Sequence, residues 1–331
     1  MKKNILITGS AGFIGSHLVE HILLNTDWNI TGIDSFRHRG DSVRVDQDHN
    51  RYKIFTHDLT TPISERLARR IGRVDYIVNM ASESHVDRSI TDPVSFCENN
   101  IKLALNMLEF ARVAKPTHFI QISTDEVYGP ALDHVNHCEW STIIPSNPYS
   151  ASKASQESLA VAWWRTYGVP VVITNTMNNF GEKQDKEKFL PMLISKIFHN
   201  EVAIIHGSED NIGSRYYLHA RNHADAVLFI LENTTPVQYY DSQEKIVVPD
   251  RYNVVGDIEL NNLEFAQMVS EIMGINLNYK LEDFHHTRPG HDRRYALDGS
   301  KLKNMGWVAP VSFRESLERT VKWTLDHPWW L

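Results

Sequence analysis

Apolar, β-branched runs alternate with amphipathic stretches through the first half of the chain. The apolar runs have the length and composition of buried strands, whereas the longer stretches repeat their apolar positions with a helical period. Strands that alternate with helices predict a Rossmann-type, doubly wound α/β fold around a parallel sheet. The expected strands are residues 4–8, 29–33, 52–56, 75–80, 118–123 and 169–174, and the expected helices are residues 13–24, 93–114 and 149–167.

The second half of the chain has a mixed pattern in which short strands and helices do not alternate regularly. With 331 residues the chain is long for a single core, so two lobes are expected. We predict a Rossmann lobe over residues 1–175 and a smaller mixed α/β lobe over residues 176–331, between which the chain is free to cross back. The expected elements of the second half are helices at 189–198, 223–231, 263–273 and 317–325, strands at 203–206 and 252–255, and an exposed excursion at 237–250.

A glycine loop follows the first expected strand and opens the first expected helix. Gly9, Gly12 and Gly15 stand in a Gly-x-x-Gly-x-x-Gly spacing, with Phe13 and Ile14 before the last glycine. Strand, glycine loop and helix in this order are typical of a dinucleotide-binding site, because the backbone can approach the pyrophosphate at the N-terminus of the helix.

An acidic residue follows the second expected strand at the distance that suits a ribose contact. Asp34 lies 19 residues after Gly15, and a carboxylate there repels a 2′-phosphate, which favours NAD over NADP. Arg37 and Arg39 weaken that preference, and a turn-capping role for Asp34 stays open. Asp58, after the third strand, is compatible with a contact to the adenine or with an N-cap of the next helix.

Candidate catalytic residues gather after the fifth expected strand. Thr124, Asp125 and Glu126 follow its C-terminal end, where the ligands of open α/β sheets bind. Tyr149 and Lys153 are four residues apart, so on a helix they share one face. A nearby ammonium group lowers the pKa of a phenol, and Tyr149 is therefore the candidate acid–base catalyst.

Composition narrows the classes of partner. The net charge of −7 argues against nucleic-acid binding, and no apolar run reaches the ~20 residues of a membrane span. The two cysteines, Cys97 and Cys138, form no disulfide framework and fit a reducing compartment. The glycine loop starts too early to follow a cleaved leader, and the histidines show no ligand spacing. We therefore expect a cytoplasmic globular protein without a metal site.

Motifs spread over nearly the whole chain resemble the dTDP-glucose 4,6-dehydratase family of the extended short-chain dehydrogenase/reductase superfamily. The superfamily pattern is the glycine loop together with Thr124, Tyr149 and Lys153. The 4-epimerases and decarboxylases of the superfamily lack the acid pair that follows Thr124 here. The narrower matches to the dehydratases are the Thr-Asp-Glu triplet and residues 84–89, 178–179 and 288–295.

The resemblance implies a complete reaction. Tyr149 would take the C4 hydroxyl proton of a nucleotide-activated glucose while hydride passes to NAD. Thr124 would bind the same oxygen, and Lys153 would bind the nicotinamide ribose. Glu126 would then remove the C5 proton as general base, and Asp125 would protonate the departing C6 hydroxyl. Hydride returned to C6 would regenerate NAD.

The resemblance also implies binding residues and an assembly. We expect a homodimer through the helices at 93–114 and 149–167, and a smaller lobe that holds the sugar nucleotide, with dTDP-glucose as first choice and UDP-glucose as second. Arginine suits its diphosphate. Besides the glycine loop and Asp34, the expected cofactor contacts are Asp58, Leu59, Ala81, Tyr149 and Lys153. The expected substrate contacts are His85, Thr124, Asn179, Lys188, Leu190, Pro191, Arg215, Arg288 and His291.

Two segments depart from the family pattern. Residues 216–222 keep the preceding arginine but lack the usual acids and tryptophan, and residues 182–186 lack the usual proline and aromatic residue. Both flank the expected nucleotide pocket, so the base preference stays open. Two other functions also stay open. One is a nucleotide-sugar 4-epimerase, which the presence of Asp125 and Glu126 disfavours, and the other is a catalytically silent NAD-binding scaffold.

Overall fold

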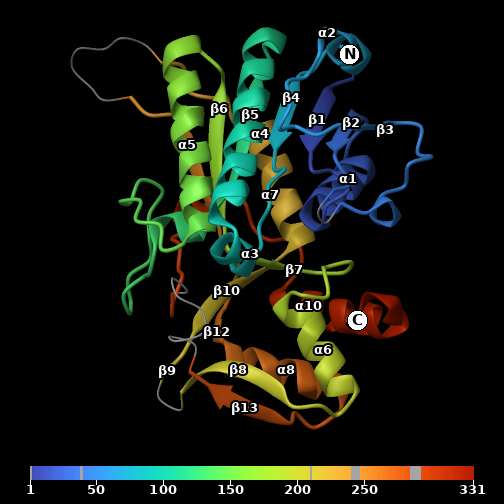
Figure 1. The fold of residues 1–331 in the computed structure, drawn as a ribbon, viewed down its shortest axis with the longest axis vertical. Helices are drawn as coiled ribbons and strands as arrows, with labels where there is room; N and C mark the ends of the chain where they lie inside the picture. Colours follow the sequence, from blue (N-terminus) through green and yellow to red (C-terminus); the bar gives the residue numbers. More distant parts are fainter. Residues whose placement is uncertain (1, 38–39, 209–210, 240–246, 284–291) are drawn as a thin grey trace.

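The computed structural model describes residues 2–37, 40–208, 211–239, 247–283 and 292–331. Its centre is a seven-stranded parallel sheet with the strand order β11-β6-β5-β4-β1-β2-β3 (Figure 1). The strand order reverses between β1 and β4, and ligands of such sheets bind beyond the carboxyl ends of the strands at this point. The strands are β1 (Asn4–Thr8), β2 (Asn29–Asp34), β3 (Tyr52–Thr56), β4 (Tyr76–Asn79), β5 (His118–Thr124), β6 (Val171–Thr176) and β11 (Asp250–Val254).

Two helical layers cover this sheet because successive residues of a strand point to opposite faces. Ile5 and Ile7 pack with α1 and α7 on one face, whereas Leu6 packs with α4 and α5 on the other. Helices α4 and α5 lie side by side (Figure 1). The helices of this lobe are α1 (Phe13–Asn25), α2 (Glu65–Ile71), α3 (Val86–Thr91), α4 (Pro93–Ala114), α5 (Pro148–Tyr167) and α7 (Ala220–Asn233), with 3₁₀ turns η1 (Ser42–Arg44) and η2 (Asp125–Tyr128).

The smaller lobe lies beyond the carboxyl ends of the central strands, at the bottom of Figure 1. It contains two three-stranded sheets, β12-β10-β7 and β13-β8-β9. Phe180, Leu193 and Phe265 belong to its separate hydrophobic core. The strands are β7 (Asn178–Phe180), β8 (Ala203–Ser208), β9 (Asn211–Ile212), β10 (Ser214–His219), β12 (Glu259–Asn261) and β13 (Tyr279–Glu282). The helices of the C-terminal half, besides α7, are α6 (Phe189–Phe198), α8 (Asn262–Met273), α9 (Ser300–Asn304), α10 (Phe313–Asp326) and the 3₁₀ turn η3 (Pro328–Trp330).

The predicted fold class is confirmed, and the chain crosses back between the lobes. β11 pairs with β6 in the central sheet, and α7 packs against α1. The division at residues 175 and 176 stays a prediction. The sequence did not reveal β7, β9 or β12, because two or three residues are too few to display a period. It also missed the longer strands β10 and β13. None of the helices in the described part of the chain is long and apolar enough to cross a bilayer.

Candidate active site

The end of β5 and the turn that follows it carry three of the predicted catalytic residues. β5 is buried along its whole length, and the 3₁₀ turn η2 starts directly after Thr124. The Thr124 hydroxyl donates a hydrogen bond to Asp125 Oδ1 at 2.9 Å and accepts one from the backbone N of Glu126 at 3.4 Å. One side chain thus holds both acids in a tight turn at the carboxyl edge of the sheet.

The N-terminus of α5 brings the predicted tyrosine and lysine to the same edge. Asn147 caps the helix, since its side chain accepts a hydrogen bond from Ser150 N at 2.9 Å. Pro148 follows in the first turn, where no backbone donor is needed. The Asn147 amide also donates to Glu126 Oε2 at 3.2 Å, so the cap orients a predicted catalytic acid. Sequence reasoning gave Asn147 no role of its own, although asparagine before a helical proline is a recognisable cap signal.

Burial sets the protonation of the two acids. Asp125 is 2% exposed, and burial, followed by the neighbouring Glu126 carboxylate, raises the pKa of Asp125 to about 7. Burial also raises the pKa of Glu126, while the hydrogen bond from Asn147 and the charge of Arg215 act in the opposite direction. An acid with a pKa near neutrality keeps part of its protons at physiological pH, which suits a general acid.

The structure corrects the predicted effect of the lysine on the tyrosine. The pKa of Tyr149 is raised rather than lowered, by burial first and then by Glu126, while a side-chain hydrogen bond with Thr124 opposes the rise. Burial lowers the pKa of Lys153 to about 8. Sequence spacing placed the pair on one face of a helix but carried no information about burial, and burial is the largest influence on both groups.

A chain of buried polar side chains holds Lys153 from inside the sheet. The Thr8 hydroxyl donates to Asn79 Oδ1 at 2.9 Å, and Asn79 Nδ2 donates to Gln121 Oε1 at 2.8 Å. Gln121 Nε2 donates to Gln156 Oε1 at 3.1 Å, and this oxygen also accepts from Lys153 Nζ at 2.7 Å. All four polar side chains are at most 1% exposed, so their hydrogen bonds lie in a low dielectric. The last of them fixes the position of the Lys153 ammonium. The sequence signal for these residues is the presence of polar positions inside otherwise apolar strands.

The glycine loop forms a cradle from which side chains are excluded. Gly9 adopts φ +67°, and a Cβ on Gly15 would lie 2.1 Å from Gly9 O. The start of α1 therefore contacts the loop at a distance that only glycine permits. Gly12 is the N-cap of α1 and supplies no side-chain hydrogen bond to the first turn. Such a helix N-terminus suits the pyrophosphate of a dinucleotide.

Asp34 holds the glycine loop and borders the cavity. Its Oδ2 accepts a hydrogen bond from Ala11 N at 3.0 Å, and its Oδ1 accepts one from Phe36 N at 2.9 Å. The side chain thus caps a turn, which was the alternative interpretation, and also lines the cavity. The contact with a ribose stays a prediction.

Asp58 is not the N-cap of the next helix, because Ser64 caps α2. The Asp58 carboxylate instead accepts hydrogen bonds from the backbone and the hydroxyl of Thr60, at 3.0 and 2.8 Å, and from the side chain of Arg37. It closes a turn after β3 and lines the cavity, so a contact with the adenine stays a prediction.

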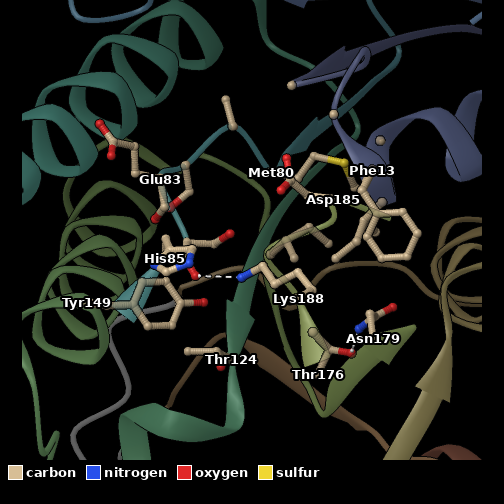
Figure 2. A pocket seen from close by; sticks show the side chains of 18 of the residues that line it. Phe13, Met80, Glu83, His85, Thr124, Tyr149, Thr176, Asn179, Asp185 and Lys188 are labelled. Atoms are coloured by element: carbon tan, nitrogen blue, oxygen red, sulfur yellow. Dashed lines mark hydrogen bonds between the residues drawn. The ribbon is translucent and has the colours of Figure 1, made fainter. Parts of the chain in front are cut away.

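The loop after β4 and the start of α6 form the opposite wall. Lys188, the N-cap residue of α6, donates from Nζ to Ser84 O at 3.2 Å. Burial lowers its pKa, and the Glu126 carboxylate opposes this, so the ammonium and the acid act on each other across the cavity. Figure 2 shows the Tyr149 phenol hydroxyl turned toward Thr124 and Lys188.

Arg215, predicted to bind phosphate, is held by the segment at residues 292–295. It is 5% exposed, and its guanidinium donates to Asp292 O at 2.7 Å and to Arg293 O at 2.6 Å. It also lies 4.5 Å from the centre of the Tyr295 ring. Arg215 therefore ties β10 to the segment at residues 292–295, while its charge also acts on Asp125 and Glu126. The phosphate contact stays a prediction.

A cavity of about 410 Å³ gathers most of the predicted residues at the carboxyl edge of the sheet. This volume lies in the range of about 300–1,000 Å³ that is usual for ligand sites. Pro191 and Arg215 are not part of its lining, and Arg288 and His291 lie outside the described residues. The predicted residues in the lining are Gly9, Gly12, Phe13, Ile14, Gly15, Asp34, Asp58, Leu59, Ala81, His85, Thr124, Asp125, Glu126, Tyr149, Lys153, Asn179, Lys188 and Leu190.

The two segments that depart from the family pattern contact each other. His219 Nε2 lies 2.9 Å from Glu182 Oε2. Burial alone would raise the pKa of Glu182, but the hydrogen bond and charge of His219 hold it down to about 2. The His17 ring of α1 lies against His219, with its Nε2 3.0 Å from Glu182 O. The acid and the histidine therefore hydrogen-bond each other, although burial lowers the pKa of His219 and favours its neutral form.

The raised pKa of Asp125 predicts a stability that depends on pH. The native state binds this proton more tightly than the unfolded state, so the free energy of unfolding falls as the pH rises from 3.8 to about 7. The expected slope is up to about 1.4 kcal/mol per pH unit. Asp125→Asn should remove this contribution, whereas Asp257→Asn, at an exposed position, should retain it. Urea unfolding at about pH 4.5 and about pH 7.5 measures the difference, and an unchanged slope in Asp125→Asn would contradict the shift.

The parallel sheet, the glycine cradle and the Thr124, Tyr149 and Lys153 constellation define an extended short-chain dehydrogenase/reductase. The model of the GDP-mannose 4,6-dehydratase family matches residues 6–320. The chain belongs to this family.

Named relatives agree with this assignment. The dTDP-glucose 4,6-dehydratase of Haemophilus influenzae is 36% identical over 347 residues, which cover 97% of this chain and 98% of that protein. A probable dTDP-glucose 4,6-dehydratase of Sinorhizobium fredii is 35% identical over 98% of this chain and 94% of its own length. The crystal structure of the dTDP-glucose 4,6-dehydratase of Streptomyces venezuelae, with NAD bound, aligns with a TM-score of 0.85 at 31% identity and covers 99% of this chain and 98% of that one.

Proposed function

We propose that this NAD-dependent nucleotide-sugar 4,6-dehydratase converts dTDP-glucose, with UDP-glucose as second choice, into the 4-keto-6-deoxy sugar nucleotide. The observation that carries the proposal is the position of Asp125 and Glu126, which line the same cavity as Tyr149. A C4 epimerisation needs a proton acceptor at C4 but no second acid–base pair at C5 and C6. The two buried acids therefore favour elimination over epimerisation.

The cavity fits the cofactor. The glycine cradle excludes side chains where a pyrophosphate would lie, and Asp34 borders the same space. When bound, NAD accepts hydride from C4 and returns it to C6. The glycine loop, Asp34 and Lys153 would hold it there.

The first task of the chain is to remove the C4 hydroxyl proton. Tyr149 takes this proton as the phenolate, Thr124 binds the same oxygen, and the Lys153 ammonium stabilises the phenolate before the transfer. The high pKa of Tyr149 comes partly from the carboxylates. When Asp125 holds its proton, one of these two negative charges is absent, so the phenolate that accepts the C4 proton forms more easily.

The second task is the loss of water across C5 and C6. Oxidation at C4 makes the C5 hydrogen acidic, so Glu126, oriented by the Asn147 amide, removes it as general base. Asp125, whose pKa lies near 7, donates its proton to the departing C6 hydroxyl. The two acids carry out opposite proton transfers in one turn because burial and their mutual repulsion separate their proton affinities.

A substrate panel tests the proposal. The purified protein is incubated with NAD and separately with dTDP-glucose, UDP-glucose and GDP-mannose, and products are detected by mass. We expect loss of one water from dTDP-glucose without net formation of NADH. A product of unchanged mass with inverted C4 would instead identify an epimerase, and binding without turnover would identify a silent NAD-binding protein.

We also propose that the protein forms a homodimer through α4 and α5. The two helices already pack side by side on one face of the central sheet. Their outer surfaces would meet those of a second copy in a four-helix contact. Sedimentation equilibrium should give twice the mass of the chain, and a monomer at all concentrations would overturn this proposal.

A further inference from the structure

A buried ion pair lies directly behind the active site without lining the cavity. Glu157 follows Tyr149 and Lys153 on the same face of α5, at successive spacings of four residues. Its carboxylate accepts a hydrogen bond from Arg251 Nη2 of β11 at 2.7 Å. Both side chains are 1% exposed. Charges buried this deeply persist only where the surroundings compensate them.

The carboxylate of this pair is tied to the catalytic strand end. Asn175 on β6 donates from Nδ2 to Glu157 Oε1 at 2.8 Å and to Thr124 O at 3.0 Å. The Asn175 amide therefore bridges the helix that carries Tyr149 and the strand that carries Thr124. A shift of Glu157 would be transmitted to both.

The guanidinium of the pair is tied to the catalytic turn. Arg251 Nη1 donates to the Tyr128 hydroxyl at 3.1 Å, and Tyr128 is the last residue of η2. The Tyr128 hydroxyl donates in turn to Glu139 O at 2.8 Å. The guanidinium also lies 4.2 Å from the centre of the Trp140 ring. Arg251 thus fixes the far end of the turn whose first two residues are the predicted acids.

We propose that the Glu157–Arg251 pair is a positioning element of the active site: the carboxylate sustains the charge of Lys153, and the guanidinium fixes the turn η2. Burial lowers the pKa of Lys153, and Glu157 is the group that opposes this. Without the carboxylate the lysine would lose its proton at lower pH, and the phenolate form of Tyr149 would lose its counter-charge.

Other titratable groups lie on the elements packed against α5. Glu157 differs from them because it lies one helical turn from the lysine and is the charge that opposes the lowering of the Lys153 pKa. They are Asp87 and Arg88 on α3, Cys97, Glu98, Lys102, Glu109 and Arg112 on α4, His118 on β5, Asp125, Glu126 and Tyr128 on η2, and Tyr149, Arg165 and Tyr167 on α5 itself.

The test compares three variants: Glu157→Gln, Arg251→Met and the double variant. Glu157→Gln keeps the hydrogen-bonding shape but removes the negative charge, so the alkaline limb of the kcat profile that follows Lys153, above the step near pH 7 set by Asp125, should move down by roughly one pH unit. Arg251→Met leaves the carboxylate unbalanced and should move this limb upward. The double variant restores neutrality and should lie between Glu157→Gln and the wild type, which keeps the test valid if a single variant folds poorly.

A second readout does not depend on turnover. The titration of Lys153 is followed by NMR of protein labelled with ¹⁵N-lysine, and Lys153→Met assigns the signal. The proposal rests on the proposed function only where kcat is the readout. A protein that shows these titration shifts but dehydrates no sugar would therefore refute the proposed function and still support the role of the ion pair.

A surface pair supplies the matched control. Arg314 and Glu318 on α10 form an exposed pair at 2.7 Å, and Glu318→Gln with Arg314→Met should move neither limb nor lysine signal. If the Glu157 and Arg251 variants lower the melting temperature and kcat without opposite shifts of the Lys153 titration, the pair is structural only and the proposal is overturned.

Discussion

Replacing Tyr149 by phenylalanine should lower kcat for dehydration by about 10²- to 10⁴-fold, the usual contribution of a general acid–base group. The ring of Tyr149 is 9% exposed and stands edge-to-face with Phe96, so phenylalanine fills the same space. The variant loses only the hydroxyl and its hydrogen bond with Thr124. The loss should therefore appear in kcat, with KM and the melting temperature little changed. Steady-state kinetics that follow formation of the dehydrated sugar measure kcat and KM, and thermal unfolding measures the melting temperature.

The control for Tyr149→Phe stands at the other end of the same helix. Tyr167 is the last residue of α5 and is 53% exposed, so Tyr167→Phe should retain full activity. Because proton transfer is lost, Tyr149→Phe should also fail to exchange the C5 hydrogen with solvent deuterium, since exchange requires prior oxidation at C4. A Tyr149→Phe enzyme that retains more than about a tenth of kcat would show that another group removes the C4 proton.

The architecture was largely predictable because the central strands and the long helices have strong periods. β1, β2, β3 and β5 lie within one residue of the expected bounds, and α4 matches the expected range. The errors fall where tertiary contacts outweigh local pattern. β6 starts at Val171 rather than 169, and α7 begins at Ala220, where the His219 side chain caps it. A histidine cap has no distinct signature in sequence.

The positions of the candidate site were predictable, but its electrostatics were not. Spacing alone placed Thr124, Asp125 and Glu126 at a sheet edge and Tyr149 beside them. The pKa of Tyr149 is raised mainly because the phenol is buried away from water. The periodicity of a sequence carries no information about the degree of burial of one side chain. The buried polar side chains that hold Lys153 were equally unpredictable, because residues such as Gln156 bind partners that are distant in the sequence.

Replacing Glu126 by glutamine should separate oxidation from elimination. The amide keeps the size and the hydrogen-bonding capacity of the side chain near Asn147 but cannot accept the C5 proton. Oxidation at C4 should therefore still occur and be visible as absorbance of bound NADH. Exchange of the C5 hydrogen with solvent deuterium should fall by about 10²- to 10⁴-fold, together with loss of water. Mass spectrometry of the sugar recovered from D₂O measures both.

Two further variants decide whether Glu126 itself is the base. Glu126→Asp retains a carboxylate on a shorter arm, and it should restore part of the exchange that glutamine abolishes. Glu98→Gln removes an exposed acid that pairs with Lys102 on α4, and it should leave exchange unchanged. Retained C5 exchange in Glu126→Gln would assign proton removal to another group. Asp125, with its raised pKa, would then be the nearest candidate, and it would act as a general base rather than as a general acid. Because a carboxyl group with a pKa near 7 is partly protonated at neutral pH, exchange catalysed by Asp125 should rise with pH through about 7, whereas its role as general acid predicts that water loss falls over the same range.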